Sequence, residues 1–172
     1  MADEPERSFV VRTEGRPSIL RVRRPGPVTT VYIARPAESA RGALTPAGAT
    51  RAEALADLLG DVALAAVFHD ADAPGAQATA APAAARAGLE ALPWPPEGRR
   101  AAVAAHEGLA LLAVVAREEI ASLLVELGGP AVERALIPAW QHDTLLTLKV
   151  RALGQEARLE RRKYGPRSRP AP

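Results

Sequence analysis

The side chains best suited to chemistry stand in one short stretch of the chain. His69, Asp70 and Asp72 place an imidazole beside two carboxylates. Such a group can hold a divalent metal ion or act as an acid–base pair. The alternative is a polar loop whose aspartates cap or turn the chain. We favour the loop, because short His/Asp stretches in loops are poor predictors of function, and we expect no metal site and no cofactor.

Two further groups of charged residues each follow an apolar run. Arg35 and Glu38 come after a β-branched segment, and Arg117 and Glu118 come after a second apolar segment. Arg35 with Glu38 can be read as a ligand clamp or as a salt bridge that orders the loop. We favour the salt bridge, which need add little stability.

The surrounding pattern predicts the elements that position these residues. Four strands are expected, at 28–34, 63–68, 109–115 and 143–150, and a short extended piece lies within 88–96. Thr45 and Pro46 are a typical helix start, and that helix ends at Gly60. Further helices are expected at 75–88 and 98–107. Another is expected to carry the apolar stripe of Ile120, Leu123, Leu124 and Leu127 and to end at Gly128. This alternation predicts a three-layer α/β fold with a mostly parallel central sheet and helices on both faces.

Two extensions flank this predicted domain of residues 28–150. Residues 1–27 contain an expected β-hairpin at 8–24, which could join the main sheet. Residues 151–172 form a basic extension with seven basic and two acidic residues, against nine basic and fourteen acidic residues in the domain. We expect a basic helix at 153–163 followed by a disordered tail. Trp94, among prolines, is read either as an exposed ridge or as a plug at the domain edge.

Composition limits the possible functions. The chain has no cysteine, which excludes disulfides, thiolate metal sites and cysteine nucleophiles. No apolar run reaches the ~20 residues of a membrane span, and the charged start is unlike a signal peptide, so we expect a cytoplasmic protein. Aromatic residues make up only 3% of the chain, so its core must consist of Ala, Leu and Val.

Four segments resemble the histidine phosphatase superfamily, the phosphoglycerate-mutase-like proteins. Residues 29–38 (TTVYIARPAE) are similar to its first strand and Arg-His-Ala/Gly-Glu signature, and 44–48 (LTPAG) to its Leu-Thr-x-x-Gly helix start. Residues 76–82 (AQATAAP) are similar to its Arg-Ala-x-Gln-Thr-Ala segment, and 113–118 (AVVARE) to its Val-Val-Gly-His-Ser turn. The likeness covers residues 28–150 and, in this order, is fairly specific.

The resemblance implies a site that has lost its chemistry. The histidine that carries the phosphoryl group in the family corresponds to Pro36, which cannot form a covalent intermediate. The second phosphate-binding arginine corresponds to Gly75, within about one residue of alignment, and the second histidine to Arg117. An alternative alignment places His106 at the second-histidine turn, but it removes the strand at 109–115 and does not restore the nucleophile.

The expected crevice carries an excess of negative charge. In a parallel sheet the carboxyl ends of the strands face one crevice. It is expected to contain two arginines and five acidic residues. Two of the acids, Glu118 and Glu119, occupy a helix N-terminus that would otherwise attract an anion. The sequence therefore predicts weak or no phosphate binding.

We consequently expect a catalytically inactive pseudoenzyme that serves as an accessory or scaffold subunit and binds a protein partner through its extensions. One alternative is a nucleic-acid- or ribonucleoprotein-associated component. The basic residues that would make this contact are Arg158, Arg161, Arg162, Lys163, Arg167 and Arg169. A second alternative is a residual or altered enzyme that uses His69 and the acids of the old pocket.

Overall fold

A computed structural model describes residues 7–13, 16–22, 26–94, 96–129, 141–153 and 156–168. The elements follow the chain in the order β1 (Arg7–Thr13), β2 (Arg16–Val22), β3 (Thr29–Ala34), β4 (Ser39–Ala40), β5 (Ala43–Leu44), α1 (Pro46–Leu58), β6 (Leu64–His69), α2 (Ala76–Arg86), β7 (Ala91–Pro93), the 3₁₀ turn η1 (Pro96–Gly98), α3 (Arg99–Ala104), β8 (Ala110–Val114), α4 (Arg117–Gly128), β9 (Thr144–Ala152) and β10 (Glu156–Lys163).

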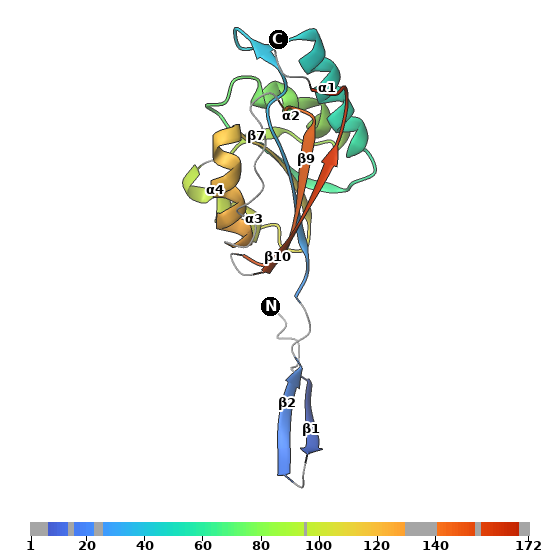
Figure 1. The fold of residues 1–172 in the computed structure, drawn as a ribbon, viewed down its shortest axis with the longest axis vertical. Helices are drawn as coiled ribbons and strands as arrows, with labels where there is room; N and C mark the ends of the chain where they lie inside the picture. Colours follow the sequence, from blue (N-terminus) through green and yellow to red (C-terminus); the bar gives the residue numbers. More distant parts are fainter. Residues whose placement is uncertain are drawn as a thin grey trace.

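A six-stranded sheet in the order β10-β9-β3-β8-β6-β7 forms the centre of the molecule. The four strands from β3 to β7 run parallel, whereas β9 and β10 are antiparallel to their neighbours. Figure 1 shows α1 and α2 on one side of this sheet and α3 and α4 on the other. The predicted three-layer, mostly parallel α/β fold is confirmed.

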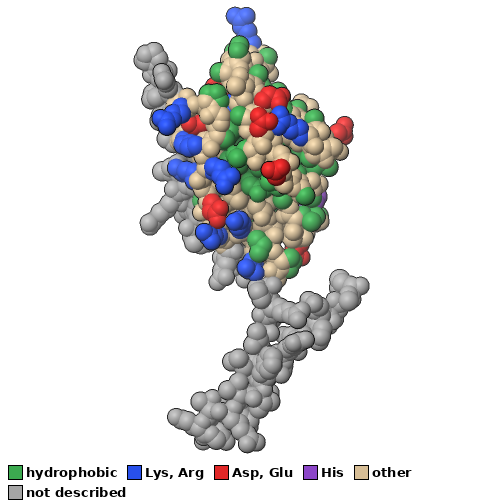
Figure 2. Space-filling model, turned by 90° about the vertical axis from the view of Figure 1, so that its right-hand side faces the viewer, with side chains coloured by type: hydrophobic (Ala, Val, Ile, Leu, Met, Phe, Trp, Pro, Cys, Tyr) green, Lys and Arg blue, Asp and Glu red, His purple; other side chains and the backbone are tan. Residues whose placement is uncertain are grey.

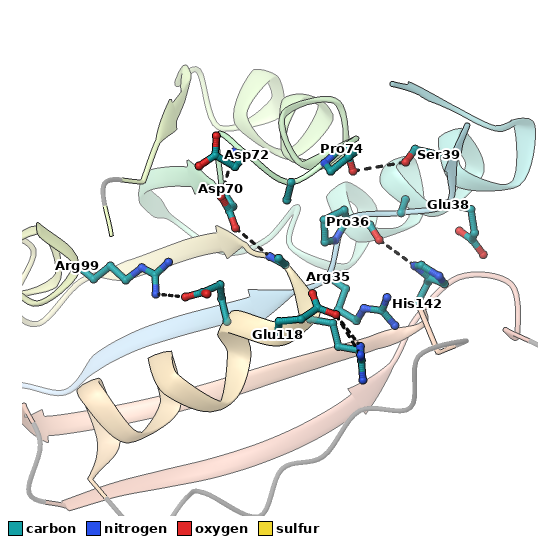
Figure 3. A pocket seen from close by; sticks show the side chains of 15 residues that line it. Arg35, Pro36, Glu38, Ser39, Asp70, Asp72, Pro74, Arg99, Glu118 and His142 are labelled. Atoms are coloured by element: carbon teal, nitrogen blue, oxygen red, sulfur yellow. Dashed lines mark hydrogen bonds and ion pairs between the residues drawn. The ribbon is translucent and has the colours of Figure 1, made fainter. Parts of the chain in front are cut away.

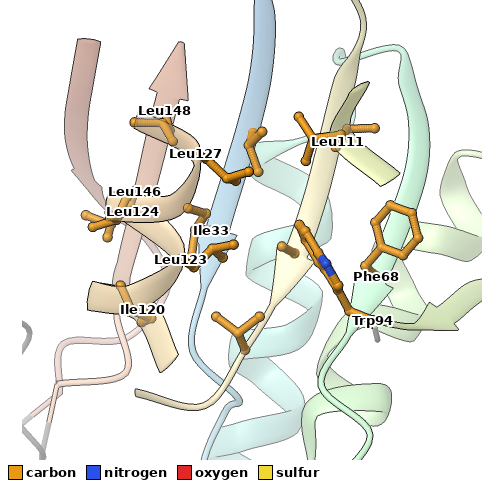
Figure 4. Close-up of a cluster of buried hydrophobic side chains, with 14 of the residues drawn as sticks. Ile33, Phe68, Trp94, Leu111, Ile120, Leu123, Leu124, Leu127, Leu146 and Leu148 are labelled. Atoms are coloured by element: carbon orange, nitrogen blue, oxygen red, sulfur yellow. The ribbon is translucent and has the colours of Figure 1, made fainter. Parts of the chain in front are cut away.

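Alternation along the strands divides the core between the two faces of the sheet. On one face, Val31 and Ile33 of β3 pack with the buried leucines of α4 (Figure 4). On the other, Ala34 of β3 packs with Leu55 of α1 and with the alanines of α2. The small alanine side chains let the two helices lie close to the sheet. The core is rich in Ala, Leu and Val, as expected.

Trp94 is a plug and not a surface ridge. Its side chain is only 2% exposed and its ring centroid lies 4.9 Å from that of Phe68. Figure 4 shows both rings at one end of the leucine cluster. The tryptophan closes the core beneath α3.

The expected basic helix at 153–163 is wrong. Residues 156–163 form strand β10, which pairs with β9 along its whole length. Ala157 and Leu159 pack against the core cluster under α4, while Arg158 and Arg162 alternate with them. Sheet pairing and this two-residue period outweigh the helix propensity of Ala, Leu, Arg and Glu. The central sheet therefore extends past residue 150, the predicted end of the domain.

The expected N-terminal hairpin is present, with Arg7–Thr13 paired to Arg16–Val22 as a two-stranded sheet of its own. It adds no strand to the central sheet. No helix of the described segments has the length and apolar character needed to cross a bilayer.

Candidate functional site

A cavity of about 810 Å³ opens where β3, β6 and β8 end, as the parallel topology predicts. Its charged and polar lining comes from four loops, the start of α3 and the start of α4 (Figure 3). The lining residues with ionisable side chains are Arg35, Glu38, Asp70, Asp72, Arg99, Arg117, Glu118, Glu119 and His142. Of the residues predicted for the site, only His69 and Gly75 are absent from the lining.

Pro36 lines the cavity, two residues after Ala34, the end of β3. Two hydrogen bonds fix the loop around it. The amide of Ala37 donates to Oγ1 of Thr79 at 2.9 Å, and the carbonyl oxygen of Pro36 lies 2.9 Å from Nδ1 of His142. A carbonyl group can only accept, so Nδ1 carries the proton and Nε2 keeps its lone pair when the ring is neutral.

Arg35 and Glu38 do not form the predicted salt bridge. Glu38 instead pairs with Arg51 of α1, with Nε 2.8 Å from Oε2 and Nη2 2.7 Å from Oε1. Arg35 donates through Nη1 to the carbonyl oxygen of Gln141 at 3.0 Å. Burial and the nearby Arg117 lower the pKa of Arg35. The wrong prediction came from the short spacing of Arg35 and Glu38, since the true partner of Glu38 lies one helix further along the chain.

Two other arginines of the cavity form ion pairs with glutamates. Arg117 lies 3.1 Å from Glu118, and Arg99 of α3 lies 2.9 Å from Glu119. Both glutamates stand in the first turn of α4, as predicted. The pKa of Glu118 is lowered, chiefly by a hydrogen bond from its own backbone amide. This contact occupies part of the helix N-terminus where an anion would otherwise bind.

The segment 69–72 follows the loop interpretation. Asp70 Oδ1 accepts from the amide of Asp72 at 3.1 Å, and Oδ2 accepts from the amide of Ala116 at 3.4 Å. His69 is the last residue of β6, is 7% exposed and does not line the cavity. Within the described segments, no cluster of histidine and acidic residues could hold a metal ion.

Gly75 also lies outside the lining. It precedes α2 with a φ of 78°, in the left-handed region that favours glycine. A Cβ atom there would lie 3.0 Å from Cβ of Ser39 and 3.2 Å from Leu44. A longer side chain at this position would require the β4–β5 loop to shift.

Two lining residues, Arg99 and His142, were not predicted from the sequence. Arg99 reaches the cavity from α3, and no local pattern marks it. His142 lies two residues before Thr144, the start of β9, and because β9 is antiparallel to β3, its first residues lie at the edge where the parallel strands end. The antiparallel direction would have been the signal, but strand direction cannot be read from residues 143–150.

Most of the basic residues predicted for the C-terminal tail belong to the central sheet and not to a tail. Arg158, Arg161, Arg162 and Lys163 belong to β10 and are exposed. Lys163 Nζ lies 2.6 Å from Oδ1 of Asp143 and anchors the start of β9. Arg167 is exposed beyond the strand, and Arg169 lies outside the described residues.

Comparison with known proteins gives a likeness in fold. No family model matches the sequence, and no curated protein matches it significantly. Solved structures do match. One is a protein from Agrobacterium tumefaciens assigned as the phosphohistidine phosphatase SixA, at 21% identity, a TM-score of 0.53, and coverage of 77% of this chain and 95% of that one.

A second protein assigned as SixA, from Nakamurella multipartitia, matches at 18% identity and a TM-score of 0.54, covering 82% of this chain and 99% of the other. Phosphoglycerate mutase from Bacillus anthracis matches at 14% identity and a TM-score of 0.57, over 79% and 93% of the two chains. The fold is phosphoglycerate-mutase-like. At these identities the likeness establishes the architecture alone, so the activity of this phosphoglycerate-mutase-like chain must be argued from its own residues.

Proposed function

We propose that this chain is a catalytically inactive protein with a histidine-phosphatase-type fold, which serves as an accessory or scaffold subunit. The observation that carries the proposal is Pro36, two residues after the end of β3, in the cavity wall. The sequence resemblance aligns this position with the family's phosphoryl-carrying histidine. The nitrogen of proline is part of the peptide bond and has no lone pair with which to attack phosphorus.

The contacts around the cavity support the same proposal. A phosphoryl-transfer site needs unengaged cationic groups aimed at the charge that develops in the transition state. Arg99 and Arg117 are instead paired with Glu119 and Glu118. An incoming phosphate would have to displace these carboxylates, and it would be repelled by Asp70 and Asp72 on the opposite wall.

Turnover assays test this proposal. The purified chain is incubated with para-nitrophenyl phosphate and with free phosphohistidine, and phosphate release is followed. We expect rates equal to those of buffer alone. Release well above buffer that follows the protein concentration would overturn the proposed inactivity.

The accessory role is tested with a tagged full-length chain recovered from its native cells. A truncation at residue 150 is unsuitable because it removes β10. The matched comparison is therefore a full-length variant in which the exposed basic residues of β10 are replaced by uncharged ones. Both proteins are recovered with and without nuclease treatment. We expect a stoichiometric partner on the unchanged chain. A bare monomer under all conditions would contradict a scaffold role.

One observation favours a second candidate function, an altered enzyme. His142 enters the cavity beside Pro36 from a different strand, and its Nδ1 contact leaves Nε2 able to accept a proton. It would replace His69 as the acid–base group of the old pocket. Turnover that disappears in His142→Gln would support this candidate over the inactive one.

A further inference from the structure

Among the described residues, no helix covers part of one side of the central sheet. Helix α2 packs on β6, β7 and β8, and α4 packs on β9 and β10 from the opposite face. Leu145, near the start of β9, is buried in the cluster that contains Leu55 of α1. Further along, the side chains of β9 and β10 that point away from α4 are partly or fully exposed in the part of the chain that the structure describes. Lys149 of β9 stands directly opposite Arg158 of β10, and Leu145 opposite Arg162.

This surface, which we call the basic sheet face, is strongly cationic. It is formed by Lys149, Arg151, Arg158 and Arg162, with Glu160 among them. Figure 2 shows Lys and Arg side chains gathered along one side of the molecule with few acidic ones between them. Glu160 bridges Lys149 at 3.3 Å and Arg158 at 3.2 Å, so one carboxylate is shared by two of these cations. The side chain of Arg158 remains 79% exposed.

A groove of about 540 Å³ runs along this face. Its floor includes Tyr32 and Thr147 from the sheet, and its far wall is apolar, formed by Leu58, Leu59 and Val62 at the end of α1. Arg162 and Lys149 line the opposite side. The groove thus places an aromatic and aliphatic surface beside a row of cations.

We propose that the basic sheet face binds single-stranded nucleic acid. Such a ligand combines a regular row of negative charges with flat bases that pack on aromatic and apolar side chains. Arginine, which supplies three of the four cations, suits phosphate oxygens because its guanidinium group donates in a planar fork. An acidic peptide would meet the cations but has no group that requires the Tyr32 and leucine wall.

This inference deepens the proposed accessory role by naming the class of partner, and it does not involve the cavity at Pro36. The test is fluorescence anisotropy of a labelled single-stranded oligonucleotide, RNA and DNA in turn, titrated with the full chain at several salt concentrations. We expect a Kd that rises steeply with salt, with a log–log slope of the association constant against salt of about −3 for four phosphate contacts.

The variant Arg158→Gln/Arg162→Gln is expected to weaken binding at least about fivefold and to make the salt slope shallower by about 1.4, or 0.7 for each lost contact. The matched control, Arg41→Asn/Arg100→Gln, removes the same charge from the β4–β5 turn and from α3, and should leave binding unchanged. Thermal unfolding of both variants verifies that they are folded.

Three results would overturn the proposal. The first is an absence of binding at low salt, which would leave the arginines as protection of an edge strand against aggregation. The second is equal weakening by the two double variants, which would mean that only net charge matters. The third is competition by polyglutamate as effective as by unlabelled oligonucleotide, which would make an acidic protein the partner.

Discussion

Arg51 and Glu38 form a bidentate ion pair that joins helix α1 to the loop after β3, with the side chain of Arg51 only 2% exposed and that of Glu38 28% exposed. The remaining Nη1 of Arg51 donates to the carbonyl oxygen of Pro166 at 2.6 Å. One buried guanidinium group therefore connects the pocket loop, the first helix and the segment after β10.

The substitution Glu38→Ala should lower the free energy of unfolding by about 3 kcal/mol, because it leaves the charge of Arg51 buried without its carboxylate. Urea denaturation measures the change. Arg86→Gln is the control, since Arg86 pairs with Glu53 and Asp57 at the surface. It should leave the denaturation midpoint unchanged. Equal effects of the two substitutions would show that burial of Arg51 is unimportant.

Acid should destabilise the fold through two carboxylates. Hydrogen bonding from Arg51 lowers the pKa of Glu38. Burial alone would raise the pKa of Asp143, but hydrogen bonds from Lys163 and the amide of Ser168 outweigh it and leave that pKa below its usual value. A group with a lowered pKa in the folded state contributes stability above its ordinary pKa and loses it as the pH falls through the lowered one.

We therefore expect the free energy of unfolding to be maintained above the ordinary glutamate pKa of 4.5 and to fall progressively at lower pH. Asp143→Asn should make this acid-induced loss smaller. Denaturation series from neutral to acidic pH provide the measurement, and an Asn variant with the same acid dependence as the wild type would contradict the assignment.

Gly48 explains the glycine of the Leu-Thr-x-x-Gly motif. A Cβ atom at this position would lie 2.1 Å from the carbonyl oxygen of Glu38, which is backbone and cannot move aside easily. Gly48→Ala should destabilise the protein by at least about 1–3 kcal/mol, although alanine is the better helix former. Gly26→Ala, whose nearest contact is 4.0 Å away, is the matched control. A stable Gly48→Ala variant would show that the loop after β3 can shift.

Tyr164 ties the segment after β10 to the core. Its side chain is 5% exposed, its hydroxyl has no hydrogen-bond partner among the described residues, and burial raises its pKa above the ordinary value. Tyr164→Phe should therefore leave stability unchanged or raise it by about 1 kcal/mol, whereas Tyr164→Ala should lower it by about 3–5 kcal/mol. Thermal and urea unfolding of the pair decide this, and a strongly destabilised Phe variant would reveal a bond to the hydroxyl.

The fold could be predicted where local chemistry and tertiary structure agree. The β-branched run before Arg35 favours only a strand, and Thr45 followed by Pro46 favours only a helix start. Oδ1 of Asp70 and the side chain of Thr45 make the local hydrogen bonds that their residue types favour. In β10, Leu159 and Ala157 have a two-residue period, but the charged residues between them are equally suited to a helix. Only pairing with β9 decides the structure.

The site was predictable to the same extent. Arg35, Glu38, Asp70 and Arg117 follow the ends of parallel strands, so topology alone brings them to one cavity. Their pairing depends on distances between elements, which placed Arg51 and not Arg35 beside Glu38. His142 was missed because it reaches the cavity from the start of an antiparallel strand.

The most direct test of the proposed inactivity is the search for a phosphorylated protein. The full chain is incubated with phosphoramidate, quenched at alkaline pH and analysed by intact-mass spectrometry, with His142→Gln in parallel. The account predicts that the mass of the wild-type chain is unchanged, since Pro36 cannot accept a phosphoryl group. A mass increase of one phosphoryl group that is absent from His142→Gln would contradict it and identify His142 as a replacement nucleophile.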